Sequence, residues 1–281
     1  MTRPPNAHIW LTSNNSDMIY RRAVLPVALA GLAIGLGVTA VHASAGTATG
    51  IGPAGPAAVT ARSTGTAATG TLVALYTFDG GRAGSIRDDS GNGHTLTLVS
   101  GNGGTVSAVP HRSGQAIRFP AKCTTTASAC PHAALRSATS PQLNPGTRAL
   151  AYGASVLLAH SQTTKGQNIL QKGYSTSSSQ WKLQIDGTAG FPSCVLVGAN
   201  PGIKIVRSTV SVADGHWHTV ECRRRSTSFT VLVDGVVRGT REVSAKLSIA
   251  NQRPLSIGGK GAYADNDQFQ GILDDVWVRV G

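Results

Sequence analysis

The chain has 281 residues, among them 34 glycines and only 13 acidic residues, and its formal net charge is +12. Much glycine, serine and threonine with little glutamate or lysine favours strands and turns, and argues against a helical protein. The basic balance favours anionic partners such as wall polymers or acidic polysaccharides, unless it forms only a solvated surface. No alternating aromatic residues accompany the densest basic cluster, 223–225, so nucleic acid is not an expected partner.

The N-terminal segment predicts export. A pair of arginines precedes an uncharged apolar run over 23–41, and small-residue cleavage patterns follow it. These features are typical of a secretory signal peptide, which we place in residues 1–45, with 1–17 as an over-extended start ahead of Met18. The alternative is an uncleaved membrane anchor, because the apolar run is long. Cleavage leaves 22 basic and 12 acidic residues, a formal charge of +10, and no stable membrane insertion is then expected.

A linker and one domain are expected after the signal peptide. Residues 46–70 are mostly glycine, alanine, threonine and proline with almost no large apolar side chain, which predicts a flexible tether. The remaining residues, 71–281, are enough for one large β domain that buries sufficient surface to fold unaided.

Short strands separated by turns are predicted throughout this domain. Residues 181–185 and 229–233 alternate apolar and polar side chains, which is the period of a half-buried strand. Asp234 and Gly235 follow the second of these segments and indicate a tight hairpin turn. In the last strand, 276–280, three valines share one face. No helix longer than a turn or two is predicted, so the pattern favours a β-sandwich or jelly roll.

The four cysteines are predicted to form two disulfides, since an even number in an exported chain favours pairing. Three pairings are possible in principle. Cys123 and Cys130 bracket a short loop that can close on itself, whereas Cys194 and Cys222 lie in strand-like segments suited to a bridge between strands or sheets. We therefore expect the bridges 123–130 and 194–222. A zinc site is the alternative, but no Cys-x-x-Cys spacing supports it.

Short motifs occur in a familiar order along the whole domain, at 76–79, 88–94, 114–119, 169–173, 181–183, 214–220, 233–235, 254–259 and 269–276. In this order they resemble the LamG-like family of concanavalin A-like jelly rolls. The resemblance implies an all-β fold, an antiparallel two-sheet jelly-roll β-sandwich. It also implies mostly structural roles for the motifs, with Trp217 and Val220 in the core near the 194–222 bridge. The alternative for a tryptophan is an exposed platform on which a sugar stacks.

Families on this scaffold often carry a calcium ion near the rim of the sandwich, and calcium prefers carboxylate and carbonyl oxygens. Asp79 ends the first predicted strand and Asp274 begins the last. Because first and last strands often pair in a jelly roll, these carboxylates can meet. The resemblance therefore implies a structural Ca²⁺ site of Asp79 and Asp274, with Asn92 or nearby carbonyl groups. The alternative is that these side chains cap turns.

Catalysis is not expected. Glycoside hydrolysis usually takes two carboxyl groups, often with a glutamate among them, and the chain has two glutamates, Glu221 and Glu242. Neither lies in the E-x-D-x-x-E arrangement of jelly-roll glucanases, and no G-x-S-x-G or H-E-x-x-H motif is present. A polysaccharide lyase that uses His216 or His218 is the alternative, although this segment matches the family's turn into a strand.

A ligand is expected among the loops at one edge of the sandwich, because loops vary on a rigid scaffold. One predicted loop offers five polar residues for sugar hydroxyls or a second calcium ion: Lys260, Tyr263, Asp265, Asn266 and Asp267. The alternative is a solvated loop that closes two strands. The sequence therefore predicts a secreted, non-catalytic, lectin-like module for an extracellular glycan or anionic wall polymer. A protein-interaction or wall-structural module is the alternative function, and no oligomeric state is predicted.

Overall fold

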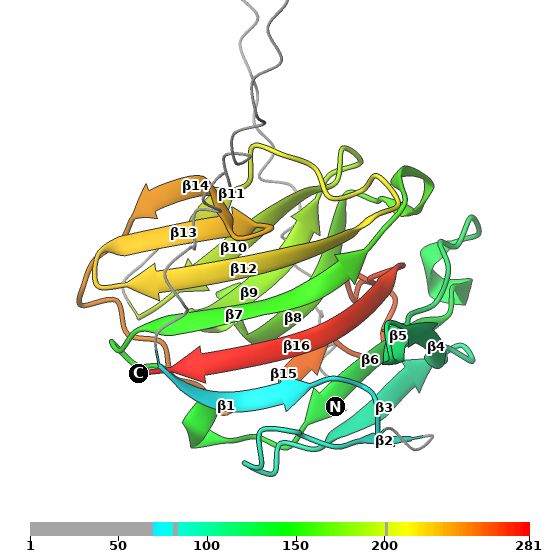
Figure 1. Ribbon diagram of the computed structural model, residues 1–281, viewed down its shortest axis with the longest axis horizontal. Coiled ribbons are helices and arrows are strands. Elements are labelled where there is room, and N and C mark those ends of the chain that lie inside the picture. Colours follow the sequence, from blue (N-terminus) through cyan, green and yellow to red (C-terminus); the bar gives the residue numbers. More distant parts are fainter. Residues whose placement is uncertain (1–69, 81–83, 200–201) are drawn as a thin grey trace, which may run out of the picture. The chain divides into compact units, whose positions relative to one another are not determined.

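The structure, a computed structural model, describes residues 70–80, 84–199 and 202–281. The predicted signal peptide at 1–45 and the predicted linker up to residue 69 therefore lie outside the described residues. Two eight-stranded antiparallel sheets face each other in a β-sandwich (Figure 1). The expected fold, an all-β antiparallel two-sheet sandwich, is confirmed. No helix in the described part of the chain is long and apolar enough to cross a membrane.

The first sheet, here called sheet A, has the strand order β14 (Val236–Glu242), β13 (Ser228–Val233), β12 (Trp217–Arg225), β7 (Leu150–Leu157), β16 (Ile272–Val280), β5 (Gly114–Arg118) and β4 (Ser107–His111), with β1 (Thr71–Tyr76) also paired to β16. The second, sheet B, has the order β11 (Lys204–Arg207), β10 (Phe191–Val197), β9 (Ser179–Asp186), β8 (Gly166–Tyr174), β15 (Leu255–Ile257), β6 (His132–Ser137), β3 (Leu96–Gly101) and β2 (Ser85–Ile86). The helices in the described residues are single 3₁₀ turns: η1 (Ala127–Ala129), η2 (Pro141–Leu143), η3 (His160–Gln162) and η4 (Ser175–Ser177).

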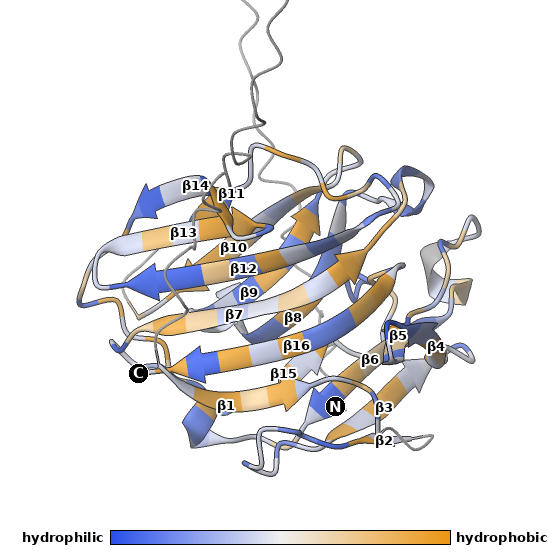
Figure 2. Cartoon of the chain, in the orientation of Figure 1, coloured by the Kyte–Doolittle hydropathy of each residue, from blue (hydrophilic) through white to orange (hydrophobic). Residues whose placement is uncertain are grey.

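The core lies between the two sheets and follows from alternation along each strand. In β9 the side chains of Trp181, Leu183 and Ile185 are fully buried against the opposite sheet. The valines at 276, 278 and 280 do the same in β16, and the banding of apolar residues along the strands is visible in Figure 2. Each such aliphatic side chain contributes about 1.5–3 kcal/mol on burial. The predicted inward faces of both segments are confirmed, but β9 is not half-buried, because Lys182 on its other face is buried as well.

The hairpin between β13 and β14 has the predicted turn. Val233 pairs with Val236, which leaves Asp234 and Gly235 as a two-residue loop. Both have positive φ, 52° and 75°, as a type I′ turn requires. The predicted pairing of first and last strands is also confirmed, because β1 pairs with β16 from Thr71↔Val280 to Tyr76↔Val276.

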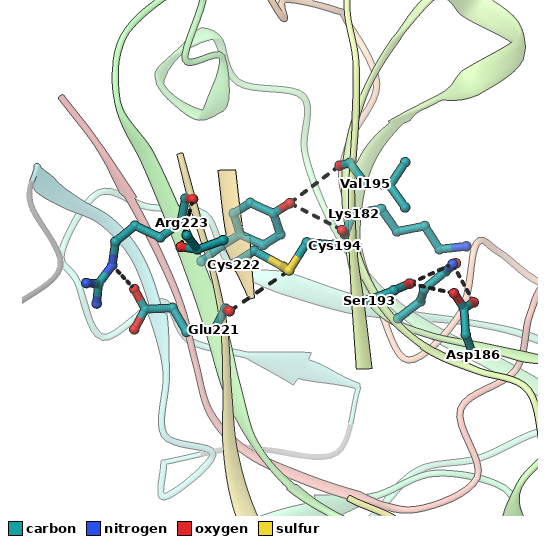
Figure 3. Close-up of a disulfide and its surroundings, with 11 residues drawn as sticks. Lys182, Asp186, Ser193, Cys194, Val195, Glu221, Cys222 and Arg223 are labelled. Carbon is teal, nitrogen blue, oxygen red and sulfur yellow. Dashed lines mark hydrogen bonds and ion pairs between the residues drawn. A yellow bond between two sulfur atoms is a disulfide. The ribbon is translucent and has the colours of Figure 1, made fainter. Parts of the chain in front are cut away.

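Both predicted disulfides are confirmed. Cys123 and Cys130 close a short loop ahead of β6, with a sequence separation of 7. Cys194 on β10 and Cys222 on β12 join sheet B to sheet A across the core, with a Cα–Cα distance of 5.6 Å (Figure 3). The longer bridge removes more freedom from the unfolded chain and links the two sheets across the core.

The expectation that Trp217 fills the core is wrong. Along β12 the even-numbered Val220 and Cys222 point inward, so the odd-numbered positions, including 217, face outward. Trp217 is only partly buried and stacks on His111, with ring centroids 3.9 Å apart. The same alternation buries Arg224, whose guanidinium donates to the carbonyl oxygens of Gly146 and Ala245. The basic cluster at 223–225 is therefore not one continuous cationic surface.

Candidate functional site

Three loops meet at one end of sheet B and enclose a cavity of about 340 Å³. One is the loop closed by the Cys123–Cys130 bridge, which leads into β6. The second is the turn at 164–166 that enters β8, and the third connects β15 to β16. The cavity is of the size that small-ligand sites have in proteins. We call it the loop cavity.

The connection from β15 to β16 is held against sheet B by its own backbone. The N–H of Lys260 donates to the carbonyl oxygen of Asn266 at 2.8 Å, which closes the loop on itself. The N–H of Asn168 on β8 donates to the carbonyl oxygen of Asp267 at 2.7 Å. On the β6 side, the N–H of Ala133 donates to Gln268 Oε1 at 2.8 Å. The predicted polar loop is therefore anchored on both sides and not merely solvated.

Asp267 is the electrostatic centre of this loop. Its Oδ2 accepts from Lys182 Nζ and from Lys260 Nζ, each at 2.9 Å. Burial raises the pKa of the Asp267 carboxyl, but the two ammonium groups outweigh burial and hold the pKa below its ordinary value. Burial also lowers the pKa of Lys182, against the opposing effect of Asp267. The charges of Asp267 and Lys260 are thus used in holding the loop to β9.

Two residues that line the cavity, Asn266 and Gln270, have a buried amide oxygen, Oδ1 and Oε1, without a hydrogen-bond partner among the described residues. The amide orientation of Asn266 is fixed, because its Nδ2 donates to the Gly261 oxygen at 2.8 Å and to Gln268 Oε1 at 3.0 Å. A flipped amide would put an oxygen against two acceptors. An unpaired buried acceptor costs about 1–3 kcal/mol, so both oxygens call for a donor from a ligand or water.

Two further charged side chains line the cavity and remain open. Asp265 is exposed and makes no hydrogen bond or ion pair with any residue that the structure describes. Lys165 is exposed at the turn into β8. The cavity therefore combines a free carboxylate, a free ammonium group and two unpaired amide oxygens. This set suits a ligand that both donates and accepts hydrogen bonds.

The structure divides the five predicted ligand-binding residues. Asp265, Asn266 and Asp267 line the loop cavity together. Lys260 and Tyr263 do not line it: Lys260 pairs with Asp267, and Tyr263 lies 47% exposed with its phenol hydrogen-bonded to Tyr174. Burial raises the pKa of the Tyr263 phenol, so it stays neutral. The sequence analysis did not predict Gln270 and Lys165. Both line the same cavity as the loop closed by the Cys123–Cys130 bridge, a contact between distant segments that no local pattern reveals.

The predicted calcium ligands are each engaged by protein groups. Asp79 Oδ1 accepts from the N–H of Gln115 at 2.7 Å. Asp274 Oδ2 is bonded to His111 Nδ1, and its Oδ1 accepts from the N–H of Asp275 at 2.7 Å. Burial raises the pKa of Asp274, against the opposing effect of His111. Both carboxylates thus contact the turn end of the β4–β5 hairpin, Asp274 from the β4 side and Asp79 from the β5 side.

Asn92 does not join them. Its Nδ2 donates to the carbonyl oxygen of Leu72, which pairs with Arg279. Arg279 is five residues along β16 from Asp274, or about 16 Å in a strand. No group of three or more His, Cys, Asp or Glu side chains within the described ranges is arranged to hold a metal ion. Asn92 thus lies apart from the two aspartates, and the ion stays a prediction.

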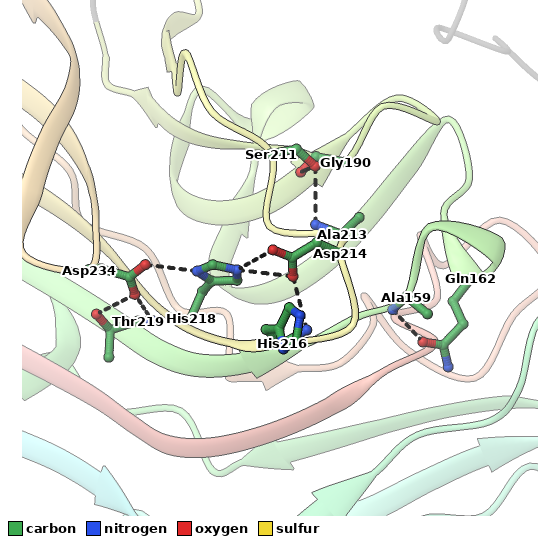
Figure 4. Close-up of polar contacts among 10 residues, drawn as sticks. All are labelled: Ala159, Gln162, Gly190, Ser211, Ala213, Asp214, His216, His218, Thr219 and Asp234. Carbon is green, nitrogen blue, oxygen red and sulfur yellow. Dashed lines mark hydrogen bonds and ion pairs between the residues drawn. The ribbon is translucent and has the colours of Figure 1, made fainter.

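The residues considered for catalysis are also placed. Glu221 faces outward from β12 and pairs with Arg223 at 2.7 Å, and Glu242 lies exposed on β14. His218 lies between two turn carboxylates, with Nδ1 2.8 Å from Asp234 Oδ2 and Nε2 3.1 Å from Asp214 Oδ1 (Figure 4). Burial lowers the pKa of His218, but these carboxylates outweigh it and raise the pKa. Both ring nitrogens therefore serve to clamp two turns.

A family model described as the concanavalin A-like lectin/glucanases superfamily matches residues 134–279, which is more than half of the chain. The match covers the strands from β6 to β16. No curated protein matches the sequence.

Similar solved structures include the binding domains of two toxins and a domain of an arabinanase. Domain 4 of AbnA, a GH43 extracellular arabinanase from Geobacillus stearothermophilus solved in complex with arabinotriose, is 16% identical with a TM-score of 0.55, covering 75% of this chain and 93% of that one. The binding domain of Paraclostridial Mosquitocidal Protein 1 is 12% identical with a TM-score of 0.55, covering 74% and 48%. The binding domain of Botulinum neurotoxin DC, in complex with rat synaptotagmin II, is 10% identical with a TM-score of 0.53 and the same coverage. The chain thus spans about half the length of these toxin domains, and the likeness shows a shared fold.

Proposed function

The chain belongs to the concanavalin A-like lectin/glucanase superfamily, and on that premise we propose that it is a secreted, non-catalytic module that binds an extracellular glycan in the loop cavity. The observation that carries the proposal is the pair of unpaired amide oxygens, Asn266 Oδ1 and Gln270 Oε1, beside the free carboxylate of Asp265. Domain 4 of the arabinanase, which has this fold, was solved with arabinotriose, and this likeness supports a saccharide ligand.

The chemistry of the cavity suits sugar hydroxyls. A hydroxyl group donates one hydrogen bond and accepts others, so it can donate to an unpaired amide oxygen and accept from Lys165. Vicinal hydroxyls can donate to both oxygens of the Asp265 carboxylate, and hydrogen bonds to charged groups contribute about 1.5–3 kcal/mol. The free ammonium group of Lys165 also gives an anionic wall polymer a contact.

Secretion is part of the proposal. Two disulfides in one domain favour an oxidising compartment, and residues 1–45 have the pattern of a secretory signal peptide. N-terminal sequencing of protein recovered from the medium tests this. We expect a first residue close to position 46, and a chain that stays with the membrane and begins at or before Met18 contradicts it.

A glycan array with neutral and acidic polysaccharides, probed with and without calcium, identifies the ligand. Its affinity is then measured for two variants that each neutralise one exposed carboxylate, Asp265→Asn in the cavity and Glu242→Gln on β14. We expect Asp265→Asn to weaken binding by about tenfold, which corresponds to about 1.4 kcal/mol, and Glu242→Gln to leave it unchanged. No array signal, or an equal effect of both substitutions, overturns the proposal.

The absence of catalysis is tested separately. Glu221, whose side chain is partly buried, forms an ion pair with Arg223, and Glu242 lies exposed on a different strand. We expect no new reducing ends and no unsaturated products when the protein is incubated with the polysaccharides that it binds. Product formation that a Glu221→Gln or His218→Gln substitution abolishes contradicts this part of the proposal.

A further inference from the structure

The outer face of sheet A carries a second cavity, of about 350 Å³. Its floor is formed by the strands β7, β12 and β16, and the side chains that define it are Arg112, Ser155, Thr219, Glu221, Asp275 and Trp277. It shares no residue with the loop cavity, which lies at sheet B. We call it the Trp277 cavity.

The register of β16 explains why an indole lies on this face. Asp274 pairs with Ser155 and Trp277 with Gly153, so β16 has one residue more than β7 over this stretch. Such a bulge redirects side chains and puts both Asp274 and Trp277 on the outer face. Gly153 leaves room for the ring, because a Cβ there would lie 3.0 Å from Trp277 Cζ2. The indole therefore lies against bare backbone as a flat apolar surface.

An ion pair with unusual backbone forms the rim of the cavity. Arg112 Nη1 lies 3.1 Å from Asp275 Oδ2, and both residues have positive φ, 51° and 45°. Arg112 occupies the first central position of the two-residue β4–β5 hairpin, where positive φ favours glycine. A non-glycine residue in such a conformation costs about 1 kcal/mol or more. The guanidinium of Arg112 is nevertheless held at the rim of the cavity by its ion pair with Asp275.

The polar groups around the indole are paired so that their charges cancel. Arg112 neutralises Asp275, and Arg223 neutralises Glu221 at 2.7 Å. The hydroxyl of Ser155 donates to Asp275 at 3.4 Å. The result is a flat aromatic surface surrounded by fixed donors and acceptors without net charge. This arrangement matches a neutral sugar ring, whose C–H face packs on an aromatic ring while its hydroxyls exchange hydrogen bonds at the edge.

We propose that the Trp277 cavity is a second saccharide site, specific for a neutral sugar ring stacked on the indole of Trp277. The module then contacts glycan through two sheets, one site at the loop cavity and one on the outer face of sheet A. The proposal does not depend on the loop cavity, since it rests on different residues.

The indole N–H resonances of the ¹⁵N-labelled full-length exported protein report on this site directly. A Trp277→Phe variant assigns the resonance, and the probes are arabinotriose, xylotriose and cellotriose. We expect the Trp277 resonance to shift saturably with at least one of them. The Asp265→Asn variant should retain this shift, which separates failure of this site from failure of the loop cavity.

Two glycine substitutions at positive φ give a matched pair. Arg112→Gly removes the guanidinium and relieves the backbone, so it should fold at least as well as the wild type. Ser226→Gly makes the same backbone change at φ 49° in the β12–β13 turn, five residues from Glu221 along the strand. We expect Arg112→Gly to bind the sugar about tenfold more weakly than the wild type, and Ser226→Gly to bind it with unchanged affinity. No Trp277 shift with any of the three sugars, loss of the shift in Asp265→Asn, or equal effects of the two glycine variants overturns the proposal.

Discussion

At the scale of single residues, His218 makes the stability of the domain depend on pH. Its ring bridges Asp214 and Asp234, both about half exposed, so the contribution is about 1 kcal/mol or less. Because the folded pKa of His218 lies above its unfolded value, the stabilisation is complete below the unfolded pKa and is lost as pH rises through the folded pKa. The protonated ring, not the neutral one, stabilises the two turns.

The test measures the free energy of unfolding in urea for the wild type and for His218→Gln between about pH 5.5 and about pH 8.5. This range runs from about one unit below to about two units above the ordinary pKa of histidine. The stability advantage of the wild type should be largest at the acidic end and shrink toward the basic end. A difference that is constant over this range, or that grows with pH, contradicts the role given to the histidine.

The calcium prediction is also decided at single residues. Asp274 uses both carboxylate oxygens within the protein, and Asn92 is held at Leu72. A bound ion would have to replace these contacts, so the same melting temperature in millimolar calcium and in excess EDTA would remove the calcium prediction. A melting temperature that rises by several degrees with calcium, and loses this gain in Asp274→Asn, would instead establish the ion.

Side-chain placement was predictable from the sequence only in part. The alternation around Val220 and Cys222 predicts an inward face of β12, but Trp217 was assigned to that face against its own parity. The outward position of Trp277 depends on the bulge in β16, which no local pattern reveals. Asp265, Asn266 and Asp267 were predicted because a polar loop stands out, whereas Gln270 and Lys165 enter the cavity only through contacts distant in sequence.

At the scale of elements, the two disulfides should differ in what their removal changes. Replacing Cys194 and Cys222 with serine releases a 28-residue loop and separates the sheets, at a cost of about 3–4 kcal/mol of stability. Replacing Cys123 and Cys130 releases a loop of 7 at about 2 kcal/mol, but loosens a wall of the loop cavity.

Denaturant unfolding and glycan titration of both double variants should therefore rank the two variants in opposite order, one by loss of stability and the other by loss of affinity. The 194–222 variant should lose more stability, and the 123–130 variant should lose more glycan affinity per unit of stability lost. Equal losses of affinity in the two variants would place the ligand elsewhere.

Long strands were predictable as elements, and short ones were not. Residues 181–185 in β9 alternate fully, those at 229–233 in β13 and 276–280 in β16 alternate except at Leu232 and Trp277, and β13 ends at an Asp-Gly turn. By contrast β2 and β15 have two and three residues, too few for a period; β2 pairs with β3 at the edge of sheet B, and β15 lies between the longer strands β8 and β6. The resemblance predicted two antiparallel sheets but not the order of strands within them, which no local pattern reveals.

At the scale of the whole molecule, part of the excess positive charge is buried or neutralised by ion pairs within the domain. Arg224 is buried, and Arg112, Arg207 and Arg223 are paired with carboxylates. Raising NaCl from about 50 mM to about 500 mM screens exposed charges strongly. A neutral glycan should keep its affinity within about twofold over this range, whereas an anionic wall polymer that binds through charge should lose affinity severalfold. Salt dependence measured for both classes therefore identifies which partner the protein prefers.

The central claim, that the loop cavity binds a glycan, is tested most directly by the side-chain amide resonances of Asn266 and Gln270 during titration with the glycan selected on the array. Both oxygens lack a partner in the described structure, so a bound hydroxyl changes the environment of both amide groups at once. Our account predicts that the two resonances shift together, with one dissociation constant that Asp265→Asn raises. Saturated binding during which neither resonance moves would contradict it.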